Sequence, residues 1–217
     1  IVYLGFRGHD GNLLREAQSA GVDGLPLRAA MRTRPFWTLS AMAIAMAAGI
    51  AGLVVHFVPL FRDLGASSQE AAAIASVLGL TSMAGRVVVG WFLDRVSDIY
   101  VTAAVLTLAA SGILLILLFG LDYAVIGVGL IGLAAGAEID LIAYLCARLF
   151  GLLHYGAIYG WQYSVFALGY GLSPLGVGLL RDSGGNYDMA LLVSGALLLL
   201  PALLAFFLRS GASLKLR

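Results

Sequence analysis

The 217-residue chain is 61% hydrophobic and 12% charged, with a mean hydropathy of +0.96 and a formal net charge of +1. Soluble domains carry about 25% charged residues, so this composition excludes an ordinary soluble domain and indicates an integral membrane protein. The near-zero charge gives no sign of nucleic-acid binding, and a single cysteine, Cys146, excludes a disulfide framework or a thiolate metal site.

The first 35 residues are predicted to precede the membrane domain. The opening six residues, IVYLGF, follow no charged segment, and they look like the end of a helix that begins earlier. Residues 7–35 are polar and contain five arginines, which is typical of a cytoplasmic linker. Within this linker, residues 26–34 form either a short basic helix on the membrane surface or ordinary connecting chain.

Six apolar segments follow, each near the roughly 20 residues that are needed to cross a bilayer. Short loops separate the segments, so consecutive helices should be antiparallel neighbours. We therefore predict an all-α membrane fold, with a six-helix bundle over residues 36–208 and a cytoplasmic tail over residues 209–217. The predicted helices cover residues 36–60, 68–93, 99–119, 123–147, 155–180 and 189–208. Ser67 and Glu70 have the spacing of a capping box at the start of the second helix.

The basic residues predict the orientation of the bundle. Ten of the 13 lysines and arginines fall in the N-terminal segment, the tail and the loops on the same side, and two fall on the other side. Basic residues in short loops favour the cytoplasm. Both ends of the chain are therefore expected in the cytoplasm, with the protein spanning the plasma (inner) membrane several times.

The thirteenth basic residue, Arg86, lies inside the second predicted helix. It precedes Arg95 by nine residues, or about 13 Å, which places it near the midplane of a bilayer. A guanidinium there costs at least about 2.5–3.5 kcal/mol unless it faces protein or water. The residues that share its helix face are small or polar, so we expect this stripe to pack inward: Gly79, Ser82, Arg86, Gly90 and Asp94.

Two acids in the fourth predicted helix lie at a similar depth. Counted from Arg148, Glu138 and Asp140 are about 15 Å and 12 Å into the membrane. Residues two positions apart in a helix are about 200° apart around its axis, so the two acids cannot share one cavity wall. We favour Asp140 in a polar cavity and Glu138 in a hydrogen-bonded position between helices. The alternative is a structural ion pair with Arg86.

The fifth predicted helix carries an aromatic stripe that includes Tyr159 and Tyr163, which lines either a cavity or an apolar packing surface. In the first helix His56 stands three residues before Pro59. Such a histidine either binds or gates a substrate, or it is hydrogen-bonded in the core.

Residues 85–95, GRVVVGWFLDR, resemble the second copy of the loop motif of the major facilitator superfamily, Gly-x-x-x-Asp-Arg. Gly90, Asp94 and Arg95 match the motif, whereas residues 96–98 depart from the basic cluster that follows in the family. Residues 136–160 are similar to bacterial transporters of the monocarboxylate and oxalate/formate type. The resemblance implies the C-terminal six-helix half of a twelve-helix secondary transporter, with a small organic anion such as a monocarboxylate as substrate.

The resemblance also implies roles for individual residues. Arg86 aligns with an arginine that engages the substrate carboxylate, and Asp140 or Glu138 would balance its charge and could carry a coupling proton. Gly90 and Asp94 would let the N-terminus of the helix near Tyr155 approach and would cap it. The residues implied to bind substrate are Arg86, Asp140, Glu138, Tyr159, Tyr163 and His56, and those implied in gating are Gly90, Asp94, Arg95 and Arg148.

Other classes fit the sequence less well. The stretch GLSPL at residues 171–175 lacks the second glycine of a G-x-S-x-G nucleophile motif, and the chain contains no P-loop motif. We therefore expect no enzymatic activity, no cofactor and no metal. A structural or accessory membrane subunit remains the alternative to a transporter half.

Overall fold

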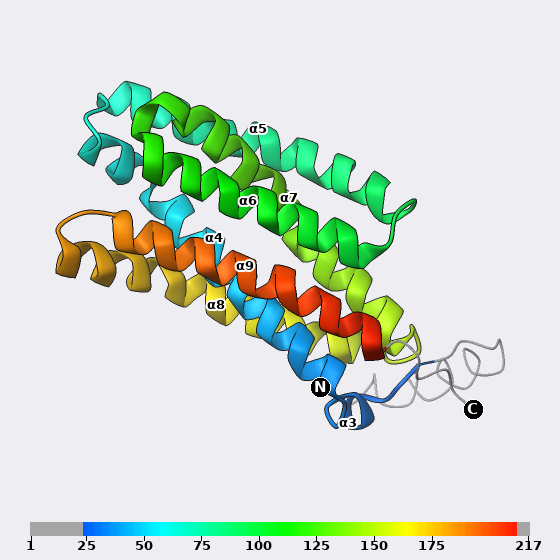
Figure 1. The fold of residues 1–217 in the computed structure, drawn as a ribbon. Coiled ribbons are helices and arrows are strands. Elements are labelled where there is room, and N and C mark those ends of the chain that lie inside the picture. The colour runs from blue at the N-terminus through cyan, green and yellow to red at the C-terminus, as the bar shows by residue number, and fades with distance from the viewer. Residues whose placement is uncertain (1–23, 212–217) are drawn as a thin grey trace, which may run out of the picture.

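The computed structural model describes residues 24–211, in which all regular structure apart from one isolated β-bridge is helical. The predicted end of a preceding helix and most of the predicted tail lie outside these residues. The labels used here are those of Figure 1. The described elements are α3 (Leu27–Ala30), α4 (Arg34–Asp63), α5 (Ser68–Leu93), α6 (Asp98–Phe119), the 3₁₀ turn η1 (Gly120–Tyr123), α7 (Ala124–Phe150), α8 (Tyr155–Gly184) and α9 (Asp188–Gly211).

The described residues therefore form the six long helices that the hydropathy predicts. By length and composition alone, residues 98–150 would count as one apolar span of 53 residues. A straight helix of that length would extend about 80 Å, against about 30 Å of hydrocarbon. The chain instead reverses at Gly120, where φ is +58°, and α6 and α7 are two antiparallel crossings.

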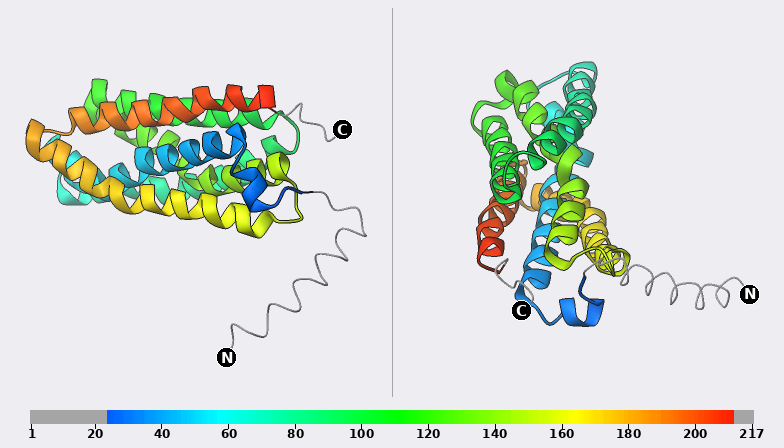
Figure 2. Two further views of the ribbon diagram at one scale, coloured as in Figure 1. Left: turned by 90° about the horizontal axis from the view of Figure 1, so that it is seen from below. Right: turned by 90° about the vertical axis from the view of Figure 1, so that its right-hand side faces the viewer.

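The six helices form two groups of three, which Figures 1 and 2 show lying along one another. In one group α4 packs against α8 and α9, and in the other α7 packs against α5 and α6. The two groups meet mainly where α6 runs beside α9. The same packing pattern is obtained when α4, α5 and α6 are exchanged with α7, α8 and α9, respectively. The chain thus consists of two three-helix repeats, α4–α6 and α7–α9. Because α4 and α7 begin on opposite sides of the bundle, the two repeats are inverted relative to each other.

Glycine allows α5 and α7 to approach closely. A Cβ atom at Gly136 would overlap the backbone of Ser82, and one at Gly85 would overlap the backbone of Leu133. Small residues at such positions are the usual means by which membrane helices pack. The packed face of α5 thus contains Gly85, Val89 and Leu93, which are buried.

The prediction that the small and polar stripe of α5 packs against other helices is therefore wrong for this bundle. Gly79 is exposed, and a Cβ atom added at either Gly79 or Gly90 would have no neighbour within 4 Å among the described residues. The observed packing face is offset by about one residue, or 100° of helix rotation. The small and polar stripe faces the cavity and the open side of the bundle instead.

Two polar contacts join α4 to α8. Ser40 donates to Oε1 of Gln162 at 3.0 Å, and Nε2 of Gln162 donates to the carbonyl of Phe36 at 3.2 Å. Further along, Oγ of Ser173 accepts from the amide of Gly52 at 2.9 Å and donates to the carbonyl of Ala48. Ser173 is thus inserted into the backbone ladder of α4, which ties these helices together at two levels.

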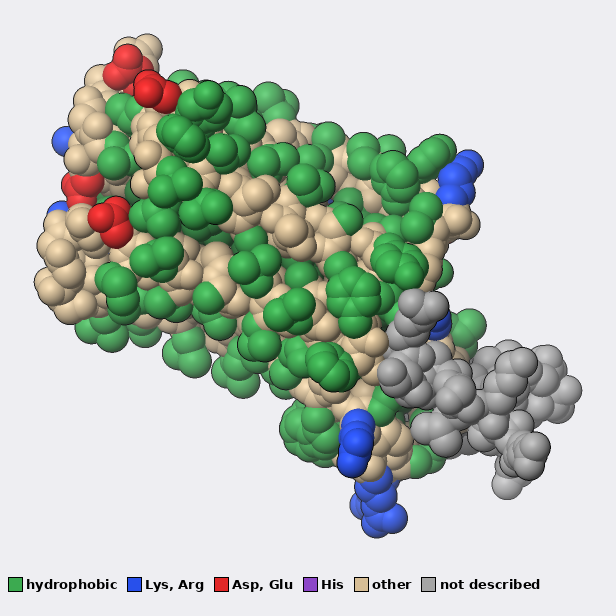
Figure 3. All heavy atoms as spheres, in the orientation of Figure 1, with side chains coloured by type: hydrophobic (Ala, Val, Ile, Leu, Met, Phe, Trp, Pro, Cys, Tyr) green, Lys and Arg blue, Asp and Glu red, His purple; other side chains and the backbone are tan. Residues whose placement is uncertain are grey.

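The surface has the character of a membrane protein. Apolar side chains cover most of the face shown in Figure 3, acidic groups gather at one end of the helices, and basic groups gather mainly at the other. Large exposed apolar residues include Leu80, Met83, Val87 and Phe207. The basic segment before α4 forms only the four-residue helix α3, and Leu25 donates to the carbonyl of Phe150 at 2.8 Å. That segment is therefore attached to the α7–α8 turn.

Candidate functional site

A cavity of about 460 Å³ lies between α4, α5, α7 and α8. Its walls are mostly apolar and aromatic, which is typical of sites for small molecules. Its two charged residues are Arg86 from α5 and Glu138 from α7. The cavity is lined by Ile50, Val54, Leu78, Ser82, Arg86, Ala135, Glu138, Ile139, Tyr163, Phe166, Ala167, Tyr170 and Gly171.

Arg86 is held against α7 by one hydrogen bond. Its Nε donates to the carbonyl oxygen of Gly136 at 3.3 Å, at the place where α5 and α7 pack most closely. Within residues 24–211 no carboxylate lies within ion-pair distance of its guanidinium. The terminal nitrogens of Arg86 are therefore available to a ligand, and the structural ion pair considered from the sequence is not formed.

Glu138 lies deep in the wall of the cavity. The residue is 3% exposed, and its Oε2 has no hydrogen-bond partner among the described residues. Asp140 is exposed and is not among the cavity-lining residues. The favoured placement is therefore wrong for both acids, because Glu138 lines the cavity with an oxygen that lacks a partner among the described residues, whereas Asp140 lies outside the cavity. The close packing at Gly136 turns the Glu138 face of α7 toward the centre of the four helices.

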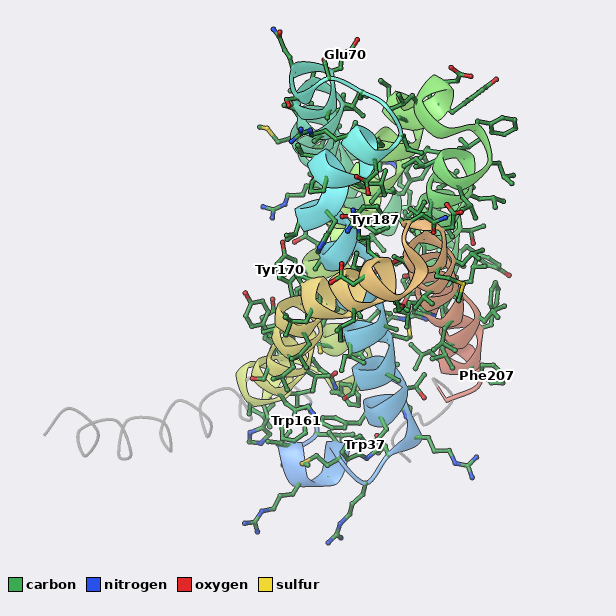
Figure 4. The ribbon with its side chains drawn as sticks, turned by 90° about the vertical axis from the view of Figure 1, so that its left-hand side faces the viewer. Trp37, Glu70, Trp161, Tyr170, Tyr187 and Phe207 are labelled. Atoms are coloured by element: carbon green, nitrogen blue, oxygen red, sulfur yellow. The ribbon has the colours of Figure 1, made fainter. Side chains whose placement is uncertain are left out.

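The aromatic stripe of α8 forms a continuous ladder. Successive ring centroids from Tyr155 through Tyr159, Tyr163 and Phe166 to Tyr170 are 5.4, 6.0, 6.1 and 6.0 Å apart. The last three rings line the cavity, whereas Tyr159, one turn before them, does not. Figure 4 shows Tyr170 projecting from α8. The C-terminal three rings of the ladder therefore border the cavity.

His56 lies outside the cavity lining. Its Nδ1 is 2.9 Å from the carbonyl oxygen of Gly52, and its ring centroid is 5.8 Å from that of Tyr187. Nearby, at the acidic end of the bundle, Arg181 donates to Asp63 at 3.2 Å. The structure therefore places His56 in a local packing cluster, one of the two environments that the sequence allowed.

The predicted cap between Asp94 and α8 is not present in the described structure. The first amides of α8 donate to the carbonyls of Leu152 and His154, and Asp94 is exposed at the end of α5. Arg95 lies with its guanidinium carbon 4.1 Å from the centroid of the Trp91 ring. Since α5 packs mainly on α7, the motif residues face away from this bundle.

The polar contact at that end is instead an ion pair between Asp98 and Arg148. Asp98 begins α6 and its side chain is 2% exposed, while Arg148 ends α7 and is 41% exposed. An acid in the first turn and a base in the last turn also match the helix dipoles. Sequence reasoning singled out Arg148 but missed Asp98, whose position at the start of an antiparallel neighbour was the available signal.

Comparisons with known proteins agree with this architecture. No family model matches the chain. The chain is 28% identical over 185 residues to monocarboxylate transporter 12 of Mus musculus, covering 83% of this chain and 38% of that protein. It is 29% identical over 195 residues to monocarboxylate transporter 13 of Bos taurus, covering 86% and 44%. The chain thus spans less than half the length of these relatives, which are transporters rather than enzymes.

An archaeal relative and two solved structures extend the comparison. An uncharacterized 38 kDa protein encoded in the 23S RNA operon of Thermoproteus tenax is 30% identical over 85% of this chain and 48% of its own length. A variant of the Escherichia coli fucose:proton symporter FucP superposes with a TM-score of 0.73 at 18% identity, covering 83% of this chain and 44% of FucP. A structure of the major facilitator superfamily transporter FucP in the outward conformation gives 0.67 at 16% identity, covering 84% and 45%.

The relatives in sequence and the neighbours in structure point to one group of membrane transporters. The apolar surface, the 3 + 3 inverted repeat and the cavity between α4, α5, α7 and α8 are those of one half of such a transporter. The chain has the fold of one six-helix half of a major facilitator superfamily transporter, and its sequence is similar to part of the monocarboxylate transporters.

Proposed function

We propose that this chain is the C-terminal half of a secondary transporter that carries a small organic anion, such as a monocarboxylate, by alternating access. Transporters of this architecture bind substrate near the bilayer midplane, between halves that rock around the site. The observation that carries the proposal is Arg86, a cation at the cavity whose terminal nitrogens have no protein carboxylate among the described residues.

Arginine suits this role because its planar guanidinium can donate two parallel hydrogen bonds to a carboxylate. The Nε of Arg86 is occupied by the carbonyl of Gly136, which fixes the orientation of the group. Arg86 lines the cavity, and its guanidinium therefore has less freedom left to lose on binding. A preoriented donor pair is what a carboxylate site requires.

The same cavity needs a second wall. α5 and α8 are the least buried of the spanning helices, and Gly79, Gly90, Gly160 and Gly171 on them have open space where a side chain would be. Small residues on an uncovered face allow another helix bundle to approach closely. We propose that an N-terminal six-helix half covers this face and that Gly90, Asp94 and Arg95 meet it at the cytoplasmic end.

The proposed topology places both ends of the chain in the cytoplasm of a plasma (inner) membrane. Among the described residues, the end of the bundle that contains α3 carries six arginines and two aspartates, and the opposite end carries two arginines and five acids. The first end is the expected cytoplasmic one. If transport is coupled to a proton, Glu138 is the cavity acid in position to carry it.

The test is uptake of radiolabelled carboxylates by proteoliposomes that contain the complete gene product. We expect uptake that saturates with substrate, competes with other small carboxylates, and is lost in Arg86→Gln at matched protein abundance. Uptake that Arg86→Gln leaves unchanged would contradict the proposal. The absence of carboxylate uptake or binding by a correctly folded protein would favour an accessory subunit.

A further inference from the structure

The cavity contains two opposite charges that do not satisfy each other. Arg86 and Glu138 both line it, yet no ion pair joins them, and Arg86 donates to a backbone carbonyl. The Oε2 of Glu138 is buried and has no partner within residues 24–211. A buried carboxylate oxygen without a donor is costly and uncommon in native proteins. The unsatisfied oxygen at a cavity wall therefore marks a place for a ligand group.

Charge balance limits what that ligand can be. With Arg86 and an ionised Glu138, the empty cavity has no net charge. A simple monocarboxylate would add an unbalanced negative charge in a site of low dielectric constant. A ligand with a carboxylate and a cationic group would pair each charge and leave the site neutral.

A proton on Glu138 would also restore neutrality, but it would not satisfy the site. The protonated acid would still place a hydroxyl donor and a carbonyl acceptor in the cavity wall without protein partners. A ligand ammonium or guanidinium donates directly to the carboxylate, and such charge-assisted hydrogen bonds are the stronger kind. The geometry therefore favours a donor that arrives with the ligand.

The aromatic wall of the same cavity suits a cation. Tyr163, Phe166 and Tyr170 of α8 line the same cavity, with neighbouring ring centroids about 6 Å apart. The faces of aromatic rings attract ammonium and guanidinium groups electrostatically. One acid beside several rings is a common environment for such a group.

We propose that the substrate is dipolar, with its carboxylate on Arg86 and a cationic nitrogen group on Glu138. This inference rests on the proposed function, because it takes Arg86 as the carboxylate site. It narrows the substrate from small organic anions in general to zwitterions of the amino-acid type, and it assigns Glu138 as the residue that selects them.

The test compares ligands that differ only in the amino group. The complete transporter is incubated with acetate or glycine, butyrate or 4-aminobutyrate, and hexanoate or 6-aminohexanoate, and binding is measured by ligand-induced thermal stabilisation. The three chain lengths vary the separation between the two charges of the ligand. For the best-fitting length, we expect the amino form to bind at least about tenfold more tightly than the plain carboxylate.

Glu138→Gln keeps the shape of the side chain and removes its charge. It should abolish the preference for the amino form, while Arg86→Gln should weaken both forms. Asp122→Asn is the matched control, because it makes the same acid-to-amide change in the exposed η1 turn and should leave the preference intact. The ligand panel on the unmodified protein tests the inference even if Glu138→Gln does not fold.

The outcomes separate this inference from the proposed function. Equal binding of the amino and plain forms at all three lengths overturns the dipolar substrate and leaves the carboxylate site standing. A preference that is lost in Asp140→Asn but kept in Glu138→Gln overturns the assignment to Glu138. Plain carboxylates that bind better in Glu138→Gln, with binding no longer dependent on pH, would make Glu138 a proton carrier instead. Failure of every carboxylate to bind contradicts the proposed function itself.

Discussion

The Nε of Arg86 donates to the carbonyl oxygen of Gly136, 3.3 Å away on the neighbouring helix, and not to either acid of that helix. This contact is possible because α5 and α7 approach closely at Gly136. One backbone bond orients the cation without neutralising it. The orientation of the Arg86 guanidinium therefore depends on the close packing of α5 and α7 at Gly136.

Substitution at Gly136 should disturb both parts. Gly136→Ala places a methyl group on the backbone of Ser82, and overpacking of this kind typically costs about 1–3 kcal/mol. We expect a lower melting temperature of the purified protein and weaker carboxylate binding. Gly129→Ala is the control, because a Cβ atom at this position of the same helix would lie 3.7 Å from its nearest neighbour, an ordinary van der Waals contact, and alanine is the better helix former. A Gly136→Ala protein as stable as Gly129→Ala would refute the packing argument.

Replacement of Arg86 should affect binding more than folding. Arg86→Lys retains the charge but loses the fork of donors, so we expect binding about tenfold or more weaker than in the wild type. Arg86→Gln should abolish binding with little change in melting temperature, because the side chain is exposed in this bundle. Arg62→Gln, an exposed arginine at the acidic end, serves as the control in ligand titrations.

The double substitution Arg86→Gln with Asp140→Asn distinguishes a binding arginine from a structural partner of Asp140. The two side chains form no ion pair, so the second change should restore nothing. We expect uptake to remain absent at matched membrane abundance. Recovered uptake in the double variant would show that Arg86 is a scaffold residue and that the site assignment is wrong.

The ion pair between Asp98 and Arg148 should stabilise the end of the bundle at which α6 begins. Arg148→Gln leaves the nearly buried Asp98 carboxylate without its cation, and we expect a loss of about 1–3 kcal/mol, reduced by the exposure of Arg148. Asp98→Asn with Arg148→Gln removes both charges and should recover part of that loss. Thermal denaturation of the single and double variants measures the coupling, and additive effects would mean that the pair contributes nothing.

Cysteine labelling tests the proposed topology. Single cysteines introduced at Ser67 and Gly185 should react with a membrane-impermeant maleimide from outside intact cells. A cysteine at Ser97 should react only after the membrane is opened. Cys146 is buried and should contribute little background labelling. External labelling at Ser97 would reverse the orientation.

The sequence alone was enough to predict the six apolar helices. Apolar runs of membrane-spanning length identify helices whatever packs around them, because the bilayer cannot satisfy any other backbone conformation in contact with lipid. The predicted segments 99–119 and 123–147 also left a break between them, and the chain reverses there at Gly120. The resemblance of residues 85–95 and 136–160 to known transporters predicted the six-helix half of a transporter fold that the structure has.

The rotation of each helix about its own axis was decided only by the tertiary structure. In a soluble protein the polar face of a helix marks the outside, but in a bilayer the lipid-facing and protein-facing sides are both apolar. The residue pattern therefore could not choose between neighbouring stripes of α5, or between Glu138 and Asp140 on α7. The choice was made by backbone contact at Gly85 and Gly136, which turns Glu138 into the cavity and leaves Asp140 outside it.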